Sequence, residues 1–340
     1  MKLIRTEDAV GHVLCHDMTQ IIPGVFKGAR FRKGHIVTEE DIPVLLEMGK
    51  ENLYVWEKTE GMLHEDEAAL RLRDLCVSEH MRCSDVKEGK IELTADADGL
   101  FEVDTERLYA VNEIGELMIA TRHTNTAVHP GDKLAGMRVI PLVIDEQKLI
   151  RAEQAAGGEP ILKITPWKLK TAAIIVTGSE VEKGLIQDRF TPVVKRKLEA
   201  FGIETVRQVL TGDDQERIRG EIVKAHEEGI GLILCTGGMS VDPDDRTPGA
   251  IARSGVKIVT YGAPTLPGAM FCLGYYEDGT PVAGLPGCVM FAKSTIFDLV
   301  MPRIAAGVPV TREDIIRLGH GGLCLGCETC HYPNCGFGKE

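Results

Sequence analysis

The stretch Gly231-Leu-Ile-Leu-Cys-Thr-Gly-Gly-Met-Ser-Val-Asp-Pro-Asp-Asp245 decides the fold of the C-terminal half of the chain. Its apolar beginning predicts a short buried strand, which runs into a Gly-Gly turn, a hydroxyl and three acids. Such an order is typical of a ligand site at the carboxyl edge of a parallel sheet, where glycines let backbone N–H groups approach an anion. A surface turn uses the same residue types, so the surrounding sequence has to separate the two interpretations.

The flanking sequence alternates between short apolar runs and segments with helical spacing. This rhythm predicts an α/β fold with a doubly wound, mostly parallel sheet, whose ligands bind at the carboxyl ends of the strands. The expected strands are residues 169–176, 204–210, 231–235, 256–259, 270–273 and 281–285, and the expected helices are residues 188–200, 214–226 and 289–304.

The first 160 residues predict an N-terminal, β-rich α+β region. Strands are expected at residues 11–14 and 52–56 with a helix at 39–48, and the basic, glycine-rich segment 22–34 favours a solvated loop over an anion site. A helix at 65–81 is followed by strands, and the Ala-Ala-Gly-Gly run within 153–159 suggests a boundary. We therefore expect domains at residues 1–60, 61–160, 161–312 and 313–340.

Composition narrows the function classes. The 340 residues include 51 acidic and 39 basic side chains, and the net charge of −12 disfavours nucleic acid and anionic membranes as partners. No apolar run approaches the roughly 20 residues of a membrane span, and the first residues turn acidic where a signal peptide would be apolar. We expect a cytoplasmic protein.

Polar or glycine-rich chemistry follows four of the expected strands. The four segments are Thr177-Gly-Ser-Glu180, Leu210-Thr-Gly-Asp-Asp214, Thr236-Gly-Gly-Met-Ser240 with Asp245, and Leu285-Pro-Gly287. In this order and spacing, residues 170–307 resemble the molybdopterin-binding domain of molybdenum-cofactor biosynthesis proteins, which include molybdopterin adenylyltransferase and molybdopterin molybdotransferase. The resemblance covers about two-fifths of the chain.

The resemblance implies a molybdopterin site at these strand ends. Backbone and hydroxyl donors of Gly237, Gly238 and Ser240 would hold the phosphate. Carboxylates cannot attract a phosphate directly, so they would act through Mg²⁺ or by hydrogen bonding to the pterin. The implied catalytic residues are Asp213 and Asp245, and the implied cofactor-binding residues are Thr177, Gly178, Ser179, Glu180, Asp188, Asp214, Thr236, Gly237, Gly238, Ser240, Pro286 and Gly287. For Asp188, capping of the following helix is an equally good explanation.

The chain departs from the molybdotransferase pattern at several positions. Leu266 and Ala269 stand where that branch usually carries two lysines, and Leu285-Pro-Gly-Cys-Val-Met-Phe291 replaces the usual Leu-Pro-Gly-Asn-Pro-x-Ser. A transferase that inserts molybdate into molybdopterin is therefore one expectation, and a non-enzymatic module that delivers or senses the cofactor, for a recipient molybdoenzyme, is another. Asp244-Asp245-Arg-Thr247 also matches the competence-damage type of nucleotide pyrophosphatase. A homodimer is the expected assembly.

The last residues carry a separate cysteine cluster. Cys324, Cys327, Cys330 and Cys335 are spaced by two, two and four residues, which indicates a soft-ligand metal site. The spacing resembles the bacterial ferredoxin run but differs in the last interval. Four thiolates, or three with His320 or His331, would also make a tetrahedral Zn²⁺ site. An iron–sulfur cluster and Zn²⁺ both remain open, and so does docking of this tail on a recipient enzyme.

Overall fold

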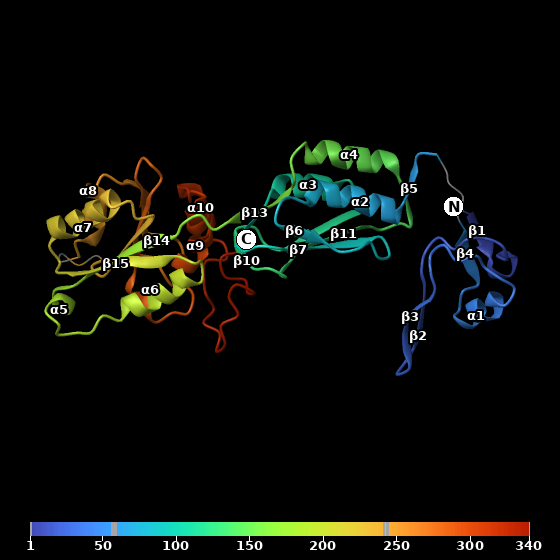
Figure 1. Ribbon diagram of the computed structural model, residues 1–340, viewed down its shortest axis with the longest axis horizontal. Coiled ribbons are helices and arrows are strands. Elements are labelled where there is room, and N and C mark those ends of the chain that lie inside the picture. Colours follow the sequence, from blue (N-terminus) through green and yellow to red (C-terminus); the bar gives the residue numbers. More distant parts are fainter. Residues whose placement is uncertain (1, 56–59, 241, 243–244, 340) are drawn as a thin grey trace. The chain divides into compact units, whose positions relative to one another are not determined.

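The computed structural model describes residues 2–55, 60–240, 242 and 245–339 (Figure 1). The described chain falls into two compact units. Unit 1 contains residues 1–96, 103–124 and 130–164, and unit 2 contains residues 97–102, 125–129 and 165–340. The division into four domains stays a prediction.

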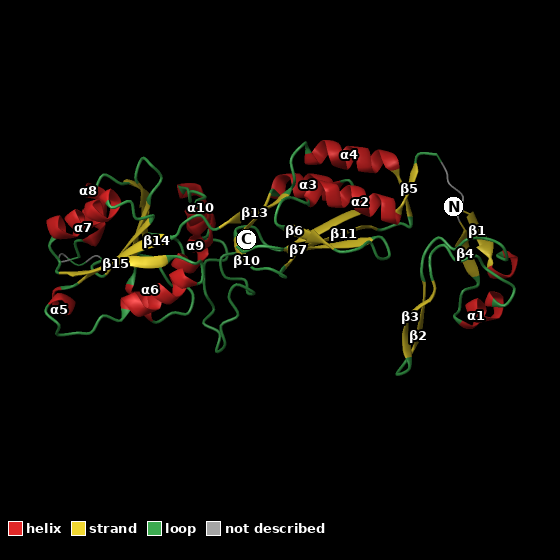
Figure 2. Cartoon of the chain, in the orientation of Figure 1, coloured by secondary structure: helices red, strands yellow, loops and turns green. Residues whose placement is uncertain are grey.

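Unit 2 is built on a six-stranded sheet, of which Figure 2 labels the strands β14 and β15. The strand order is β15-β14-β16-β19-β18-β17. The first four strands are mutually parallel, and β18 and β17 are antiparallel to their neighbours. The predicted doubly wound, mostly parallel α/β fold is confirmed. The strands are β14 (Thr171–Thr177), β15 (Glu204–Thr211), β16 (Leu232–Thr236), β17 (Lys257–Tyr261), β18 (Cys272–Tyr275) and β19 (Pro281–Leu285).

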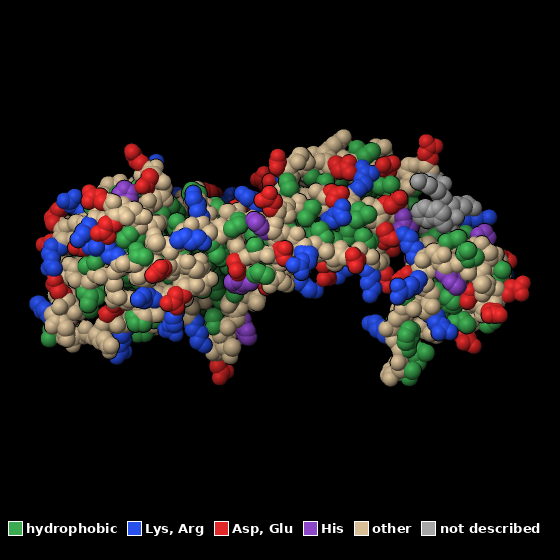
Figure 3. Space-filling view, viewed as in Figure 1, with side chains coloured by type: hydrophobic (Ala, Val, Ile, Leu, Met, Phe, Trp, Pro, Cys, Tyr) green, Lys and Arg blue, Asp and Glu red, His purple; other side chains and the backbone are tan. Residues whose placement is uncertain are grey.

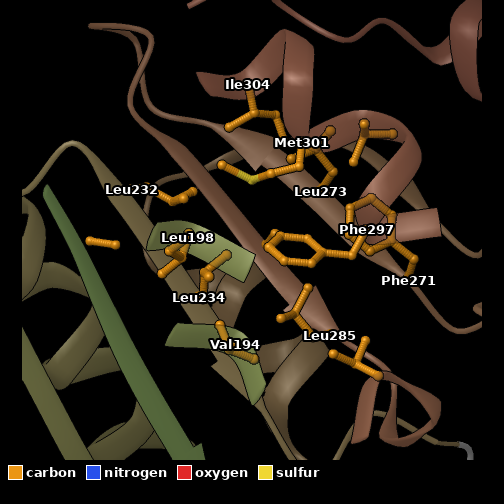
Figure 4. Close-up of a cluster of buried hydrophobic side chains, with 14 of the residues drawn as sticks. Val194, Leu198, Leu232, Leu234, Phe271, Leu273, Leu285, Phe297, Met301 and Ile304 are labelled. Atoms are coloured by element: carbon orange, nitrogen blue, oxygen red, sulfur yellow. The ribbon is translucent and has the colours of Figure 1, made fainter. Parts of the chain in front are cut away.

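Alternation along β14 shows how one strand serves two cores. Ala172, Ile174 and Val176 face a core completed by α6 (Phe190–Glu199) and α9 (Ile296–Ala306), part of which Figure 4 shows around Phe297. Ala173 and Ile175 face the opposite core, which is completed by α7 (Gln215–Glu227) and α8 (Thr247–Arg253). Because successive side chains of a strand point to opposite faces, a sheet buried on both faces needs a continuous apolar run.

The closing helix differs from its predicted extent, 289–304. A 3-10 turn, η2 (Gly287–Met290), follows β19, and α9 begins only at Ile296. Thr295 and Asp298 form a capping box at that start, which explains why the helix begins there. The pattern also missed three short helices, namely α5 (Ser179–Glu182), α8 (Thr247–Arg253) and α10 (Arg312–Arg317).

The N-terminal part of unit 1 contains its own small core of Leu14, Met18, Phe31, Leu45 and Leu53 with neighbouring apolar residues. Its strand β4 and helix α1 match the expected positions, although Trp56, the last residue of the expected strand, lies outside the described residues. The predicted strand at 11–14 is only a pair of isolated bridges. The elements are β1 (Lys2–Arg5), η1 (Thr6–Asp8), β2 (Met18–Ile22), β3 (Phe26–Phe31), α1 (Asp41–Glu47) and β4 (Asn52–Val55).

The expected solvated loop at 22–34 is wrong, because β2 and β3 form an antiparallel hairpin there. Its turn is closed by the Val25 N–H, which donates to Ile22 O over 3.0 Å, and Gly24 takes the positive φ of 76°. The alternation of apolar and polar residues that identifies a strand is missing from β2 and β3, because exposed apolar or basic side chains lie on both faces of the hairpin.

The remainder of unit 1 and the adjoining segments form an α+β region with more helix than expected. A four-stranded sheet, β6-β7-β11-β9, packs against α2, and α3 and α4 were not predicted. The elements are β5 (Met62–His64), α2 (Glu65–Cys76), β6 (Met81–Cys83), β7 (Lys90–Ala95), β8 (Gly99–Val103), α3 (Thr105–Glu113), β9 (Leu117–Thr121), β10 (Thr126–Val128), β11 (Lys133–Val139), β12 (Val143–Asp145), α4 (Glu146–Ala156) and β13 (Leu162–Pro166).

The cysteine-rich tail folds back on unit 2. The Leu266 N–H donates to Gly322 O and the Cys324 N–H donates to Leu266 O, each over 2.8 Å. The Tyr332 hydroxyl donates to Asp298 O over 2.8 Å, and Phe337 is buried. Among the described residues no helix has the length and apolar character that a membrane span requires.

Candidate functional site

The four strand ends singled out in the sequence meet at one edge of the unit 2 sheet. Thr177 of β14 lies beside Thr211 of β15, and Thr236 of β16 lies beside Leu285 of β19. Because these strands are parallel, the segments that follow them all leave from the same edge. The antiparallel neighbours bring a further segment there, since Tyr261 pairs with Cys272 and Cys272 with Gly284. The loop 262–271 therefore borders the same edge.

The Gly-Gly turn is held against its neighbours too closely for any side chain. A Cβ at Gly237 would lie 2.2 Å from Thr177 O, and one at Gly238 would lie 2.9 Å from Thr247 Oγ1. Their φ angles of 86° and 55° also lie in the left-handed region that favours glycine. Both glycines are therefore required by the turn itself.

Thr247, the first residue of α8, fixes the direction of the peptides in this turn. Its hydroxyl donates to Gly237 O over 2.8 Å, so the Thr177 hydroxyl must donate in the contact of 3.2 Å between the two threonines. The Thr247 N–H donates to Gly238 O over 3.2 Å. In a planar trans peptide the N–H opposes the C=O, so the N–H groups of Gly238 and Met239 point away from α8. Two such successive amides form a concave donor suited to an anion.

Asp213 connects two of the site segments. One oxygen of its carboxylate accepts from both the backbone N–H and the hydroxyl of Ser179, each over 2.9 Å. The Glu182 carboxylate lies beside the same turn, where the Arg217 guanidinium donates to it over 2.5 Å and lowers its pKa. A Cβ at Gly212 would lie 2.5 Å from Glu182 Oε2, so this glycine too is closely packed. Asp213 therefore positions the segment after β14, independently of the catalytic role that the family resemblance implied.

Two other acids of the predicted site cap helices. Asp214 is the N-cap of α7 and accepts from the Arg217 N–H over 2.8 Å. Asp188 accepts from the N–H groups of Phe190 and Thr191 over 2.8 and 3.1 Å at the start of α6. For Asp188 this is the helix-capping alternative that the sequence left open.

Several predicted residues lie exposed at the rim of the edge. Glu180 and Ser240 are exposed, and so is Gly287, while Pro286 is buried directly before the 3-10 turn. Asp245 is half-buried, and its N–H donates to Asp242 O over 2.9 Å. The rim thus offers accessible hydroxyl and carboxylate groups beside the closely packed glycine turn. Asp244, which belongs to the pyrophosphatase-like segment 244–247, lies outside the described residues.

Three threonines end adjacent strands of the sheet, and the sequence singled out only two of them. Thr211 and Thr236 are buried, and their hydroxyl oxygens have no hydrogen-bond partner among the described residues. Thr177, between them, is satisfied by Thr247. Thr211 ends β15 where Thr177 ends β14, and this equivalent position in the sequence could have identified Thr211 as a site residue.

Tyr261 was also missed. It ends β17, and its hydroxyl lies 3.2 Å from Met239 O and 3.4 Å from Ser240 O, to which it donates. A tyrosine hydroxyl keeps its proton near neutral pH, and burial raises the pKa of Tyr261 further. It clamps the loop that follows the glycines. An isolated tyrosine at the end of an edge strand gives no sequence signal for such a contact.

The described residues do not bring three or more His, Cys, Asp or Glu side chains together in a way that could hold a metal ion. Of the described acids at the sheet edge, Asp213 and Asp214 already accept hydrogen bonds from Ser179 and from the Arg217 N–H. Likewise, the sulfurs of the tail are not gathered around one point. Cys327 and Cys330 are exposed, and the Cys330 sulfur contacts Ser294 Oγ at 3.5 Å.

Comparison with known families identifies the domain. Residues 173–306 match a family model described as a "probable molybdopterin binding domain", and residues 3–57 match one described as a domain of unknown function (DUF8806). The chain therefore carries a molybdopterin-binding domain of the molybdenum-cofactor biosynthesis type, as the resemblance of the strand-end motifs implied.

Curated relatives are similar to part of the chain. A CinA-like protein of Mycobacterium sp. strain JLS is 37% identical over 82 residues, which are 24% of this chain and 20% of that protein. The CinA-like protein of Mycobacterium tuberculosis strain H37Rv is 34% identical over 82 residues, or 24% of this chain and 19% of that protein. The chain thus spans about a fifth of the length of these relatives.

Solved structures cover a larger share of the chain at lower identity. The molybdopterin biosynthesis enzyme MoaB of Thermus thermophilus is 21% identical, with 42% of this chain and 99% of that chain covered and a TM-score of 0.36. The protein CinA of Thermoplasma acidophilum is 17% identical, with 40% and 98% covered and a TM-score of 0.34. Similarity at this level does not assign an activity.

Replacing Gly237 by Ala should destabilise unit 2 by at least about 2 kcal/mol, because the added Cβ meets Thr177 O and the backbone is strained. The measurement is the free energy of unfolding by urea denaturation. Gly287→Ala is the matched control, since nothing lies within 4 Å of a Cβ at that position. Equal stability of the two variants would contradict the packing described here.

Proposed function

We propose that this protein binds molybdopterin at the edge formed by the segments after β14, β15, β16 and β19, and that it takes part in molybdenum-cofactor assembly. The observation that carries the proposal is the glycine turn at Gly237 and Gly238, which directs two backbone amides away from α8. A phosphate suits such a donor pair. The family match of residues 173–306 supports the same ligand.

In the proposed complex, the terminal phosphate of molybdopterin lies on the amides of Gly238 and Met239 and on the Ser240 hydroxyl. Asp245, half-buried beside this turn, accepts hydrogen bonds from N–H groups of the pterin. Asp213 contributes indirectly, because its carboxylate holds Ser179 in place. The hydroxyls of Thr211 and Thr236, which have no hydrogen-bond partner in the described part of the chain, lie buried at these strand ends.

We favour binding and transfer of the cofactor over insertion of molybdate as the function of this protein. Leu266 and Ala269 stand where cationic side chains would attract the molybdate anion, and Leu266 is tied by its backbone to the tail. With no lysine at these two positions, molybdate would lack that attraction. Delivery to a recipient molybdoenzyme therefore fits the chain better than metal insertion, and a transferase reaction remains the enzyme-class hypothesis.

Titration of the purified protein with molybdopterin, followed by pterin fluorescence, should show saturable binding. Asp245→Ala should weaken the affinity roughly tenfold, the effect of losing one hydrogen bond to a charged acceptor. The matched control is Asp278→Ala, because Asp278 lies in the turn between β18 and β19 at the opposite edge of the sheet. Absence of binding, or equal affinities in both variants, would refute the proposed site.

A nucleotide pyrophosphatase of the competence-damage type is the second candidate, because Asp244-Asp245-Arg-Thr247 after the Gly-Gly turn matches the sequence pattern of that type. It predicts cleavage of ADP-ribose that depends on an added divalent cation and is lost in Asp245→Ala. Product analysis by chromatography with Mg²⁺, Mn²⁺ or Co²⁺ measures this. Failure to turn over ADP-ribose with any of the three ions removes this candidate.

For the tail we propose that Cys324, Cys327, Cys330 and Cys335 gather around a metal when it is supplied. Protein purified without oxygen should show a broad visible absorption band if an iron–sulfur cluster is bound, or stoichiometric zinc by elemental analysis if it is not. Replacing Cys327 and Cys330 by Ser should abolish whichever signal is present, while Cys83→Ser should leave it unchanged. If the wild-type protein is purified without metal and then binds neither iron–sulfur cluster nor zinc when these are supplied, the proposed site is excluded.

A further inference from the structure

The N-terminal module, residues 2–55, exposes apolar side chains out of proportion to its size. Of the 25 large hydrophobic residues that are exposed in the described chain, ten lie between residues 3 and 54. Contiguous exposed apolar surface on a soluble domain commonly marks an interaction site. The ten residues are Leu3, Val10, Val13, Ile21, Ile22, Val25, Phe26, Ile36, Leu46 and Tyr54.

Four of these residues belong to the hairpin of β2 and β3, residues 18–31, which we call the arm. At its root Met18 and Phe31 are buried in the module core, with 3% and 8% of their surface exposed. From there β3 extends about 17 Å to the turn, at 3.4 Å a residue. Figure 3 shows hydrophobic side chains gathered along the arm, where Val25 at the turn is 81% exposed.

Apolar side chains occupy both faces of the arm. Ile21 and Ile22 are neighbours on β2, so they point to opposite faces, and they are 63% and 41% exposed. The sheet has only two strands, so both outer edges also lack a partner strand among the described residues. A two-stranded hairpin is only marginally stable alone in water. A protein groove can cover both faces and pair the edges, whereas hydrocarbon would leave the edge N–H and C=O groups unsatisfied.

The rest of the module, which we call the body, carries a matching apolar face. Leu3 pairs with Tyr54 across β1 and β4, and Val13 pairs with Ile36. Leu14 bridges Val55, and both are buried, so the adjacent Val13 and Tyr54 must both point outward. All four outward residues are between 40% and 58% exposed.

Charge distinguishes the arm from the body. The arm, residues 18–31, has two basic residues, Lys27 and Arg30, and no acid, and neither of the two forms an ion pair within the described chain. The body has five basic and eight acidic residues. Two arms would repel each other, whereas an arm and a body attract. The module is therefore complementary to a second copy of itself.

We propose that two copies of this chain form a twofold dimer in which each arm lies across the body of the other. The apolar tip of the arm covers the outward face of Leu3, Val13, Ile36 and Tyr54, and its basic residues lie among the acidic residues of the body. A twofold axis makes every arm contact occur twice, which doubles the buried area. This inference is independent of the molybdopterin site, since every residue that carries it lies within residues 2–55.

Sedimentation velocity of the full-length protein should give a dimer of the 37.1 kDa chain at micromolar concentration. The arm variant Val25→Asp with Phe26→Asp should raise the dimer dissociation constant at least about a hundredfold, because apolar anchors dominate such contacts. The body variant Leu3→Asp with Tyr54→Asp should do the same. Leu185→Asp, which changes a 75% exposed leucine of unit 2, should leave the dimer intact.

Mixing the arm variant with the body variant provides the decisive measurement. The mixture contains one intact arm and one intact body that face each other, so it should form heterodimers more tightly than either variant forms homodimers. Circular dichroism of each variant checks that it is folded. A monomeric wild type, a dimer that survives the arm variant, or a mixture without heterodimers would each overturn the proposal. So would arm-dependent binding of a monomeric wild type to phosphatidylglycerol vesicles.

Discussion

The candidate site depends on one buried hydroxyl pair, Thr177 and Thr247. Together they connect the end of β14, the turn after β16 and the start of α8, and they require that Gly237 and Gly238 carry no side chain. Because the Thr247 hydroxyl donates to Gly237 O and the Thr247 N–H donates to Gly238 O, the directions of both peptides in the turn follow. The amides that point away from α8 are thus a result of packing on the buried side of the sheet.

Much of the pterin domain could be predicted because its strands are buried on both faces. A continuous run such as residues 171–177 has few alternatives to a central parallel strand, and the glycine turns marked the strand ends. The roles of individual acids were harder to predict from the sequence. Asp213 and Asp214 are adjacent in sequence, yet one carboxylate holds Ser179 and the other caps α7, a difference that only the local backbone decides.

The N-terminal half was harder to predict for a physical reason. In the arm, apolar and basic residues occupy both faces, so the alternation between buried and exposed positions that identifies a half-buried strand is missing. Tyr261, in unit 2, shows a second limit of prediction from sequence. Its contact with Met239 O joins residues 22 positions apart through tertiary packing alone. Neither feature leaves a periodic signal in the sequence.

The tail adds a strand-like contact to a loop at the rim of the site. Leu266 donates to Gly322 and accepts from Cys324, so the loop 262–271 shares its backbone hydrogen bonds with the last twenty residues of the chain. A truncation chosen from the family boundary, near residue 306, would remove these partners and leave an incomplete rim. The rim of the site is therefore complete only when residues 307–339 are present with the domain.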